Sequence, residues 1–263
     1  MLFCCCLCVG SKKRDRANSN SNYVESVVSP LTEANLSKHN DIYKTALFVK
    51  RLRDSSNPPV TNLSSIENLD LTGTDVSDSE LEILPDGCPL LKTLILLECP
   101  VRKIDVLANC KNLKLLELCS TSVSNTSLSI VVKALPLLES LSLCGNKHLT
   151  DKWIQSLEYC SLKELDLMGT GVTDLGVAHL ATRFLNLECL SLAFTGVTDK
   201  GVTSLQECQK LHTLFLWNTN ITGSCFKELV HLRSIDVSCC EFLSDEGRRA
   251  LEDCNKLVSL LGV

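Results

Sequence analysis

Apolar residues recur along the chain at a regular spacing, from about residue 66 to the C-terminus. Each unit has an apolar residue, two variable positions, a second apolar residue, one variable position, a third apolar residue and, three places on, Thr, Cys or Asn. Side chains alternate between the two faces of a strand, so each unit predicts a short strand with its second and third apolar residues pointing inward. These pairs are Leu69/Leu71, Leu94/Leu96, Leu116/Leu118, Leu141/Leu143, Leu165/Leu167, Leu190/Leu192, Leu214/Leu216 and Ile235/Val237, followed by an unfinished unit with Leu257 and Leu260.

The units follow one another every 21 to 25 residues or so. At this spacing a leucine-rich repeat places one short strand and one helical return in each unit. One unit alone cannot bury its apolar side, but stacked units bury a continuous core. The sequence therefore predicts an α/β leucine-rich repeat solenoid, a curved parallel sheet with helical returns, of about eight repeats plus a truncated last unit. We call the sheet face opposite the helical returns the concave face.

Helix starts are predicted in the second half of each unit. A Thr or Ser stands where the helical return would begin, and an Asp follows it, at Thr150, Thr173, Thr198 and Ser244. Thr and Ser are favoured N-cap residues, and an Asp in the first turn suits the positive end of the helix. Each unit is therefore expected to run strand, turn, capped helix.

Two further features recur in the units and resemble a known family. The motifs are Val172-Thr173-Asp174 with Gly176, Val197-Thr198-Asp199 with Gly201, and Leu243-Ser244-Asp245 with Gly247. Cysteines end the helical returns at Cys88, Cys110, Cys160, Cys208 and Cys254. These features resemble the cysteine-containing leucine-rich repeats of F-box/leucine-rich proteins and of the antagonist-of-mitotic-exit family. The resemblance implies the solenoid fold and, as one function, substrate recognition in an SCF-type ubiquitin ligase. Residues 24–60 lack the opening Leu-Pro and the ordered leucines of an F-box.

Composition excludes some classes of protein. The net charge of -5 and the pI near 5.6 argue against nucleic-acid binding, which needs a basic stripe. No stretch reaches the roughly 20 apolar residues of a membrane span. The five histidines are scattered, no glycine loop could cradle a phosphate, and the paired carboxylates Glu164 and Asp166 would lie on an open sheet without a pocket. We therefore expect no catalytic residues, no cofactor and no enzyme activity.

Sixteen cysteines are present, and most of them occupy repeat positions. Besides the cysteines that end the helical returns, Cys99 and Cys240 stand at the turn position that Thr fills in other units. A small, weakly polar side chain packs well there, which favours reduced structural cysteines in the cytosol. A metal site between Cys119 and Cys144, on adjacent strands, is the weaker alternative. No metal is predicted.

The amino terminus differs in character from the repeats. Four thiols lie in an apolar run and a basic cluster follows at once, comprising Cys4, Cys5, Cys6 and Cys8 and then Lys12, Lys13, Arg14 and Arg16. A secretory signal would place its charge before the apolar run. Two acyl chains, or one with a basic patch, anchor a protein stably to anionic lipid. We therefore expect S-palmitoylation of these cysteines and attachment to the cytoplasmic face of a membrane. The alternatives are an unmodified tail on a soluble cytosolic protein and a degenerate targeting sequence.

Three segments divide the chain. Residues 1–30 form the Cys-rich basic tail and an Asn- and Ser-rich spacer, residues 31–60 a helical cap, and residues 61–263 the repeat domain. Residues 41–53 have apolar residues at helical spacing, and Pro58-Pro59 stops the helix. Solenoids need their ends capped, so we expect this helix to cover the end of the leucine core. The alternative is a helix that docks a partner, such as a ligase subunit.

The outward-pointing strand residues would form the contact surface of the concave face, and none of them is Lys or Arg. Two apolar groups are predicted there: an aromatic group of Phe194, Phe215, Trp217 and Met168, and an aliphatic group of Ile95, Leu97 and Leu115. Phe194 should come within about one strand spacing, ~5 Å, of Trp217. Acidic side chains should flank both groups, at Glu117, Glu164, Asp166 and Asp236. The alternative is that these side chains lean over neighbouring strands or lie beneath a loop.

Exposed aromatic residues are common hot spots of protein interfaces, and acidic flanks favour a partner with basic residues beside an apolar anchor. The leading hypothesis is a non-catalytic, membrane-tethered interaction scaffold that binds a protein partner on the concave face. The alternatives are a ubiquitin-ligase substrate-recognition subunit that uses residues 41–53 in place of an F-box, and a regulator that inhibits an enzyme by covering it.

Overall fold

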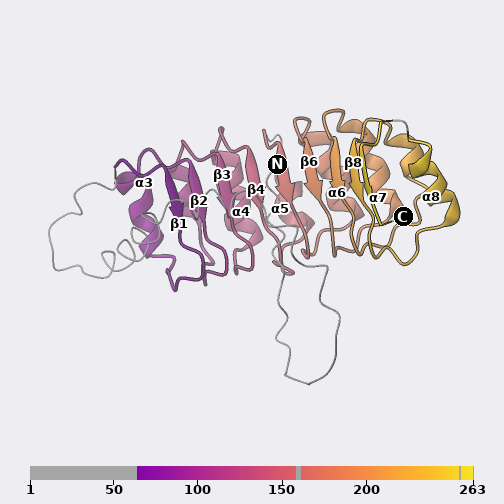
Figure 1. Cartoon of the computed structure of the whole chain (residues 1–263). Helices are drawn as coiled ribbons and strands as arrows, with labels where there is room; N and C mark the ends of the chain where they lie inside the picture. The colour runs from indigo at the N-terminus through magenta and orange to yellow at the C-terminus, as the bar shows by residue number, and fades with distance from the viewer. Residues whose placement is uncertain (1–63, 158–160, 255, 263) are drawn as a thin grey trace, which may run out of the picture. The chain divides into compact units, whose positions relative to one another are not determined.

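The computed structural model of the protein describes residues 64–157, 161–254 and 256–262 (Figure 1). The chain divides into two units, residues 1–55 and 56–263, and every described residue belongs to the second. The predicted cysteine-rich tail, spacer and capping helix, together with Cys160, lie outside the described residues.

A single parallel sheet runs through the described unit, with its strands in the order of the sequence. Each strand pairs in register with the next through its central apolar residue, as Leu69 does with Leu94 and Leu214 with Ile235. The nine strands are β1 Asn68–Asp70, β2 Thr93–Ile95, β3 Leu115–Glu117, β4 Ser140–Ser142, β5 Glu164–Asp166, β6 Cys189–Ser191, β7 Thr213–Phe215, β8 Ser234–Asp236 and β9 Ser259–Leu261. The predicted solenoid of eight repeats and a shortened ninth is confirmed.

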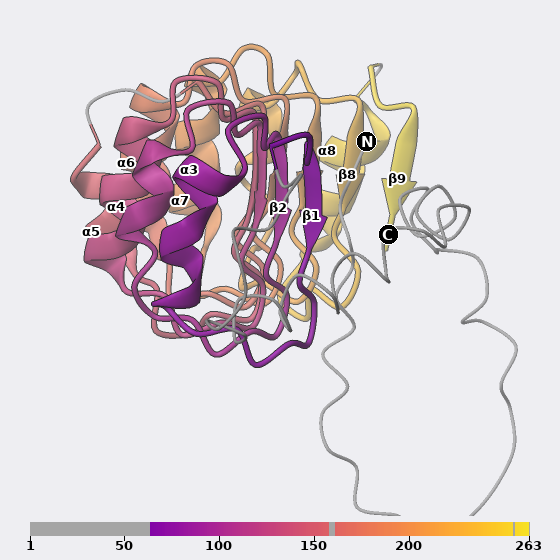
Figure 2. The same ribbon diagram turned by 90° about the vertical axis from the view of Figure 1, so that its left-hand side faces the viewer.

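The helical returns lie on one side of this sheet, as the two views show (Figures 1 and 2). They are η1 Glu80–Ile83, α3 Leu84–Gly87, η2 Asp105–Asn109, α4 Asn125–Ala134, α5 Asp151–Gln155, α6 Asp174–Arg183, α7 Asp199–Ser204, η3 Leu205–Glu207, η4 Phe226–Glu228 and α8 Asp245–Glu252, where η denotes a 3₁₀ helix. In the described part of the chain, none of these helices has the length and apolar content to span a bilayer. The opposite face of the sheet is left to the outward-pointing strand residues.

The core lies between the sheet and the helices. The inward-pointing strand residues Leu94, Leu116 and Leu165 are all fully buried, which confirms their predicted direction. Trp153 of α5 and Phe184, which follows α6, fill the space behind the middle strands and meet edge to face, with ring centroids 6.4 Å apart. Full burial of a leucine side chain stabilises the fold by roughly 1.5–3 kcal/mol, and stacking repeats this contribution in every unit.

The third residue after each strand from β1 to β8 has left-handed backbone. Its amide donates to a carbonyl of the next repeat, as Gly73 does to Leu97 at 2.8 Å and Phe194 to Trp217 at 2.9 Å. The φ angles at this position are Gly73 66°, Glu98 59°, Ser120 54°, Gly145 76°, Gly169 65°, Phe194 54°, Asn218 53° and Cys239 58°. Glycine adopts this conformation freely, whereas a bulky residue is an outlier there. Phe194 is therefore the costliest occupant of the column.

The next residue of each turn ties the coil together by a hydrogen bond to a backbone carbonyl. Threonine bonds within its own repeat, as Thr195 Oγ1 does to the Leu192 carbonyl at 2.6 Å. The thiol of Cys99 instead donates to the carbonyl of Leu71 in the preceding repeat at 3.0 Å, and Cys240 to that of Leu216 at 3.1 Å. The small polar role predicted for these two cysteines is thus confirmed.

Three of the predicted helix-ending cysteines lie in the core, whereas Cys254 is half-buried. Cys88, Cys110 and Cys208 are buried, and burial raises the pKa of each thiol to about 11, with the charge of Cys88 adding to the rise at Cys110 and that of Glu207 to the rise at Cys208. A thiol that stays protonated is a poor nucleophile and a poor metal ligand. Within the described ranges these cysteines pack as small apolar side chains.

Helix caps follow the sequence prediction with one exception. The side chains of Thr173, Thr198 and Ser244 accept hydrogen bonds from amides of the first helical turn, so these N-caps are confirmed. Thr150 stands at the N-cap of α5, but its hydroxyl makes no capping bond and has no partner among the described residues. Ser124, which the sequence prediction passed over, caps α4 by accepting from the amide of Ser127 at 3.1 Å.

Candidate partner-binding face

The aromatic group lies at the end of the concave face near β6 and β7. Phe194 and Trp217 pack edge to face, with ring centroids 4.8 Å apart and planes at 66°, so the predicted proximity of the two rings is confirmed. Phe194 is 45% exposed, and Phe215 and Trp217 are partly exposed. Phe194 occupies the left-handed turn position. Phe215 and Trp217 are two residues apart in extended chain, so their side chains point to the same face of the sheet. The rings therefore form one apolar surface across two repeats.

Met168 and Asp166 do not contribute to that open surface. Their positions on β5 and just after it point to the concave face, as predicted, but Met168 is 9% exposed and Asp166 only 4%. The prediction of an exposed carboxylate at Asp166 is wrong, because hydrogen-bonding neighbours enclose it. Its Oδ1 accepts from the amide of Met168 at 2.9 Å, and its Oδ2 from the hydroxyl of Ser142 at 3.3 Å.

Asp166 belongs to a polar row that crosses the middle of the sheet. The hydroxyl of Ser142 also lies 2.9 Å from the thiol of Cys119, and Ser191 on β6 hydrogen-bonds to the carboxylate from the other side. Burial outweighs these hydrogen bonds and raises the pKa of Asp166 above its usual value. The centre of the face is consequently a floor of small polar side chains with little exposed charge.

The aliphatic group lies on β2 and β3. Ile95, Leu97 and Leu115 are all partly exposed. The register pairs Leu115 with Thr93, and Ile95 with Glu117. Leu115 therefore lies diagonal to Ile95 and farther from Leu97, so the group is a sloping band rather than one compact patch.

Three predicted acidic residues remain partly exposed on this face. Glu117 pairs in register with Ile95, and Glu164 accepts a hydrogen bond from Ser140 at 3.1 Å. Asp236 lies in register beside Phe215 on the neighbouring strand, and its Oδ1 accepts from the amide of Ser238 at 2.9 Å. In the described ranges, neither Glu164 nor Asp236 lies within ion-pair distance of a basic side chain. Glu117 and Asp236 thus place negative charge beside the two apolar groups, whereas Glu164 lies between Ser140 and Cys189.

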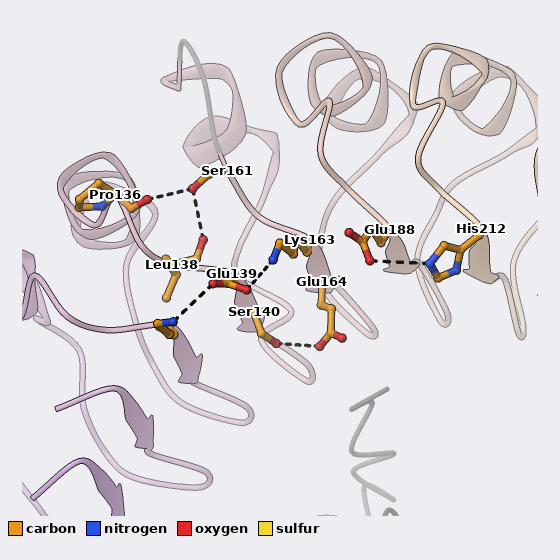
Figure 3. A network of polar contacts seen from close by, with 10 residues as sticks. Pro136, Leu138, Glu139, Ser140, Ser161, Lys163, Glu164, Glu188 and His212 are labelled. Carbon is orange, nitrogen blue, oxygen red and sulfur yellow. Dashed lines mark hydrogen bonds and ion pairs between the residues drawn. The ribbon is translucent and has the colours of Figure 1, made fainter.

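Acidic residues at the edge where the strands begin are paired, in contrast (Figure 3). Glu139 contacts Lys163 at 2.7 Å and Lys114 at 3.8 Å, and Glu188 lies 3.8 Å from His212. The hydrogen bond from Lys163 holds the pKa of Glu139 below its usual value. A shallow hollow of about 300 Å³ at this edge is lined by Leu137, Ser161, Asn186 and Lys210 along with these charged residues. Within it Lys163 pairs with Glu139, and the ammonium group of Lys210 donates to the side-chain oxygen of Asn186 at 2.7 Å.

Chemistry-bearing clusters are missing from the described residues: no group of three or more His, Cys, Asp or Glu could hold a metal ion there. Cys119 and Cys144, the weaker metal hypothesis, are both buried on the sheet.

The sequence prediction missed the strained backbone of Phe194. Glycine stands at the equivalent position in Gly73, Gly145 and Gly169, and that alignment could have revealed it.

Comparison with known proteins identifies the repeats. A family model described as Leucine Rich repeat matches residues 160–181, 185–205 and 228–251. No curated protein gives a significant match. Among solved structures, an internalin (inlF) from Listeria monocytogenes shares 19% identity at a TM-score of 0.56, over 84% of this chain and 68% of that one.

An internalin C2 (inlC2) from the same organism also shares 19% identity at a TM-score of 0.56, over 76% of this chain and 82% of that one. At this level of identity the likeness concerns the fold alone. The finer resemblance to cysteine-containing repeats of F-box and mitotic-exit proteins stays a prediction. The protein contains leucine-rich repeats and folds as a leucine-rich repeat solenoid.

Proposed function

We propose that the protein is a non-catalytic interaction scaffold that binds a protein partner on its concave face. Leucine-rich repeat domains generally serve as protein-interaction surfaces, since stacking creates an extended concave sheet. The observation that carries the proposal is the pair formed by Phe194 and Trp217, an aromatic surface left partly open to water. Exposed aromatic surface of this kind is typical of interface hot spots.

The rest of the face fits this role. The aliphatic band of Ile95, Leu97 and Leu115 supplies a second apolar contact, and Glu117, Glu164 and Asp236 supply negative charge around both. Buried Asp166 and Met168 would form part of the floor beneath a partner rather than contact it directly. A partner with apolar anchors and basic flanks would complement this surface in shape and charge.

The test is affinity purification with mass spectrometry, using the wild-type chain and Trp217→Ala. Truncating a hot-spot tryptophan costs about 2 kcal/mol or more, so the main partner should be bound roughly 30-fold more weakly. Phe242→Ala is the matched control, because Phe242 is 61% exposed but lies in a turn beyond the sheet. Circular dichroism should report folded protein for both variants. Equal recovery of every partner by Trp217→Ala and wild type would remove the proposal.

We also propose that acylation of Cys4, Cys5, Cys6 and Cys8 tethers the scaffold to the cytoplasmic face of a membrane. The support is the sequence: four thiols in an apolar run followed by Lys12, Lys13, Arg14 and Arg16. Changing the four cysteines to Ser should abolish thioester-linked lipid labelling and move the protein to the soluble fraction. Cys239→Ser is the control, since Cys239 is an exposed cysteine of the repeat domain. An unchanged distribution of the fourfold variant would refute the tether.

The same purification distinguishes the alternative roles. Cullin and Skp1-type proteins among the partners would favour a substrate-recognition subunit of an SCF-type ligase. A single enzyme recovered in a one-to-one ratio would favour an inhibitor that covers it. In both cases the concave face remains the proposed contact surface, and Trp217→Ala remains the variant that tests it.

A further inference from the structure

The carboxylates of the repeat domain differ in whether a basic side chain is near them. Along the strand-start edge, Glu67, Glu139 and Glu188 each have a Lys or His within 4.0 Å. On the concave face, Asp236 and Glu164 have no such partner among the described residues. The face carries no Lys or Arg at any outward strand position from Asn68 to Ser238. No basic side chain of the described residues balances the charge of Asp236.

Asp236 stands beside the aromatic group. The register of β7 and β8 sets it directly opposite Phe215, at a strand spacing of about 4.8 Å. Its Oδ1 is held by the amide of Ser238, which fixes the direction of the carboxylate. On the other side, Phe215 is in register with Ser191. Phe194, Phe215, Trp217 and Asp236 together form what we call the aromatic corner.

We infer that the aromatic corner binds the guanidinium group of an arginine side chain on the protein partner. This inference rests on the proposed function and narrows it to one kind of side chain. A cation over an aromatic face is attracted by the ring quadrupole, and arginine makes this contact more often than lysine. Guanidinium also stacks on flat rings and forms paired hydrogen bonds with a carboxylate. An aromatic surface next to a directed carboxylate offers both interactions at once.

The backbone of Phe194 supports a binding role for its ring. A left-handed conformation is strained for a non-glycine residue, and burial offsets only part of this strain because the ring is 45% exposed. Gly, Asn or Ser, which occupy the same column in other repeats, would fold with less strain. Strained residues of this kind cluster at binding sites. The ring of Phe194 is therefore better placed to contact a partner than to stabilise the core.

The test uses a short synthetic peptide in which one arginine is flanked by leucines, and the same peptide with citrulline, the neutral isostere, in place of arginine. Calorimetry with the whole protein should show at least tenfold weaker binding of the citrulline peptide. Asp236→Asn should weaken the arginine peptide about tenfold and reduce its sensitivity to salt. Asp70→Asn is the matched control, because Asp70 holds the same position in β1 and its Oδ1 likewise accepts the amide two residues on.

Two results would overturn the inference. One is equal affinity for the arginine and citrulline peptides, which would indicate apolar contact only. The other is that neither peptide binds, while the Trp217→Ala variant loses a captured partner that the Asp236→Asn variant keeps. In that case the scaffold function survives without the arginine site. If Trp217→Ala retains every partner, the proposed function itself fails, so the two failures are distinguishable.

Discussion

The carboxylate of Asp174, the first residue of α6, accepts two hydrogen bonds from Thr198, the N-cap of the next repeat. The amide of Thr198 donates to Oδ1 at 2.8 Å, and its hydroxyl donates to Oδ2 at 2.7 Å. Asp151 holds Thr173 in the same way. The sequence predicts that this Asp stabilises the positive end of its own helix. In the structure it also links its repeat to the next one.

At Thr150 this link is half complete, because its hydroxyl finds no acceptor on the preceding repeat. The repeats before Thr173 and Thr198 have Asp151 and Asp174 at this position, whereas the repeat before Thr150 has Asn125. Its Oδ1 accepts from the amide of Thr150 at 3.0 Å, but its amide nitrogen cannot accept from the hydroxyl and contacts the carbonyl of His148 instead. Asn125→Asp should restore the acceptor and raise the free energy of unfolding by about 1 kcal/mol. Chemical denaturation measures it, and Thr150→Val, which removes the hydroxyl, should cancel most of the gain. A destabilised Asn125→Asp protein would contradict this account.

Asp199 should make stability depend on pH in the acidic range. Burial opposes its ionisation, but bonds from Thr222, Gly223 and Cys225 more than compensate, and together they lower the pKa of Asp199. A carboxyl whose folded pKa is lowered stabilises the fold above the ordinary Asp pKa, near 3.9, and this contribution is lost as pH falls below it.

Asp199→Asn should therefore cost about 1.5–3 kcal/mol at pH 7, the range for hydrogen bonds to a charged group, and less at pH 3. Urea unfolding at the two pH values measures the difference. Asp245→Asn serves as control, because Asp245 holds the same position in the last repeat and accepts no hydrogen bond from the described residues. The same loss at both pH values would exclude the charge as the cause.

Asp166 should have the opposite pH dependence. Because burial raises its pKa, the folded state holds the proton more tightly, so stability is greatest below the unfolded pKa near 3.9 and declines as pH rises through the folded pKa. Asp166→Asn removes the buried charge and keeps an acceptor for the amide of Met168. The free energy of unfolding at pH 7 should rise by roughly 1 kcal/mol, the lower end of the cost of burying a polar group. Thermal unfolding at pH 4 and pH 7 decides it; a loss of stability at pH 7 would show that the carboxylate is needed by its serine partners.

Phe194→Asn should separate binding from folding. Asn tolerates left-handed backbone, so relief of strain offsets the lost contact with Trp217, worth about 0.5–1.5 kcal/mol. The free energy of unfolding should change by less than about 1 kcal/mol, while capture of the partner falls as it does for Trp217→Ala. Phe226→Ala, which empties a buried site, is the contrasting variant and should cost about 3–5 kcal/mol. A comparable loss from Phe194→Asn would make Phe194 a core residue.

Much of the fold could be predicted because the period is local and repeated. The spacing of Leu69, Leu94 and their equivalents fixes which residues point inward, and the in-register pairing follows from it. The same reasoning brought Phe194 near Trp217, since both positions are set by the repeat. The role of Cys99 and Cys240 at the turn could be predicted because Thr stands at the same position in other units.

What could not be predicted depends on neighbours that differ from one repeat to the next. Asp166 occupies the same strand position as the partly exposed Asp236, but Ser142 and Ser191 enclose the first, whereas Phe215 lies in register beside the second. Thr150 matches Thr173 in sequence pattern, and only the identity of Asn125 in the preceding unit separates them. Strand periodicity predicts the face to which a side chain points, but its burial and hydrogen bonding depend on side chains about 25 residues away.

The in-register sheet also separates two kinds of change to the chain. Successive central strand residues are 21 residues apart between Leu214 and Ile235 and 25 apart between Leu69 and Leu94, yet both pairs of strands align identically. The helical returns absorb this difference. Insertions, deletions and substitutions in the helical returns therefore leave the partner-facing strand residues in place. One residue inserted inside a strand, in contrast, would move every later side chain of that strand to the opposite face of the sheet. The protein can acquire new outer contacts while its inner surface keeps the same specificity.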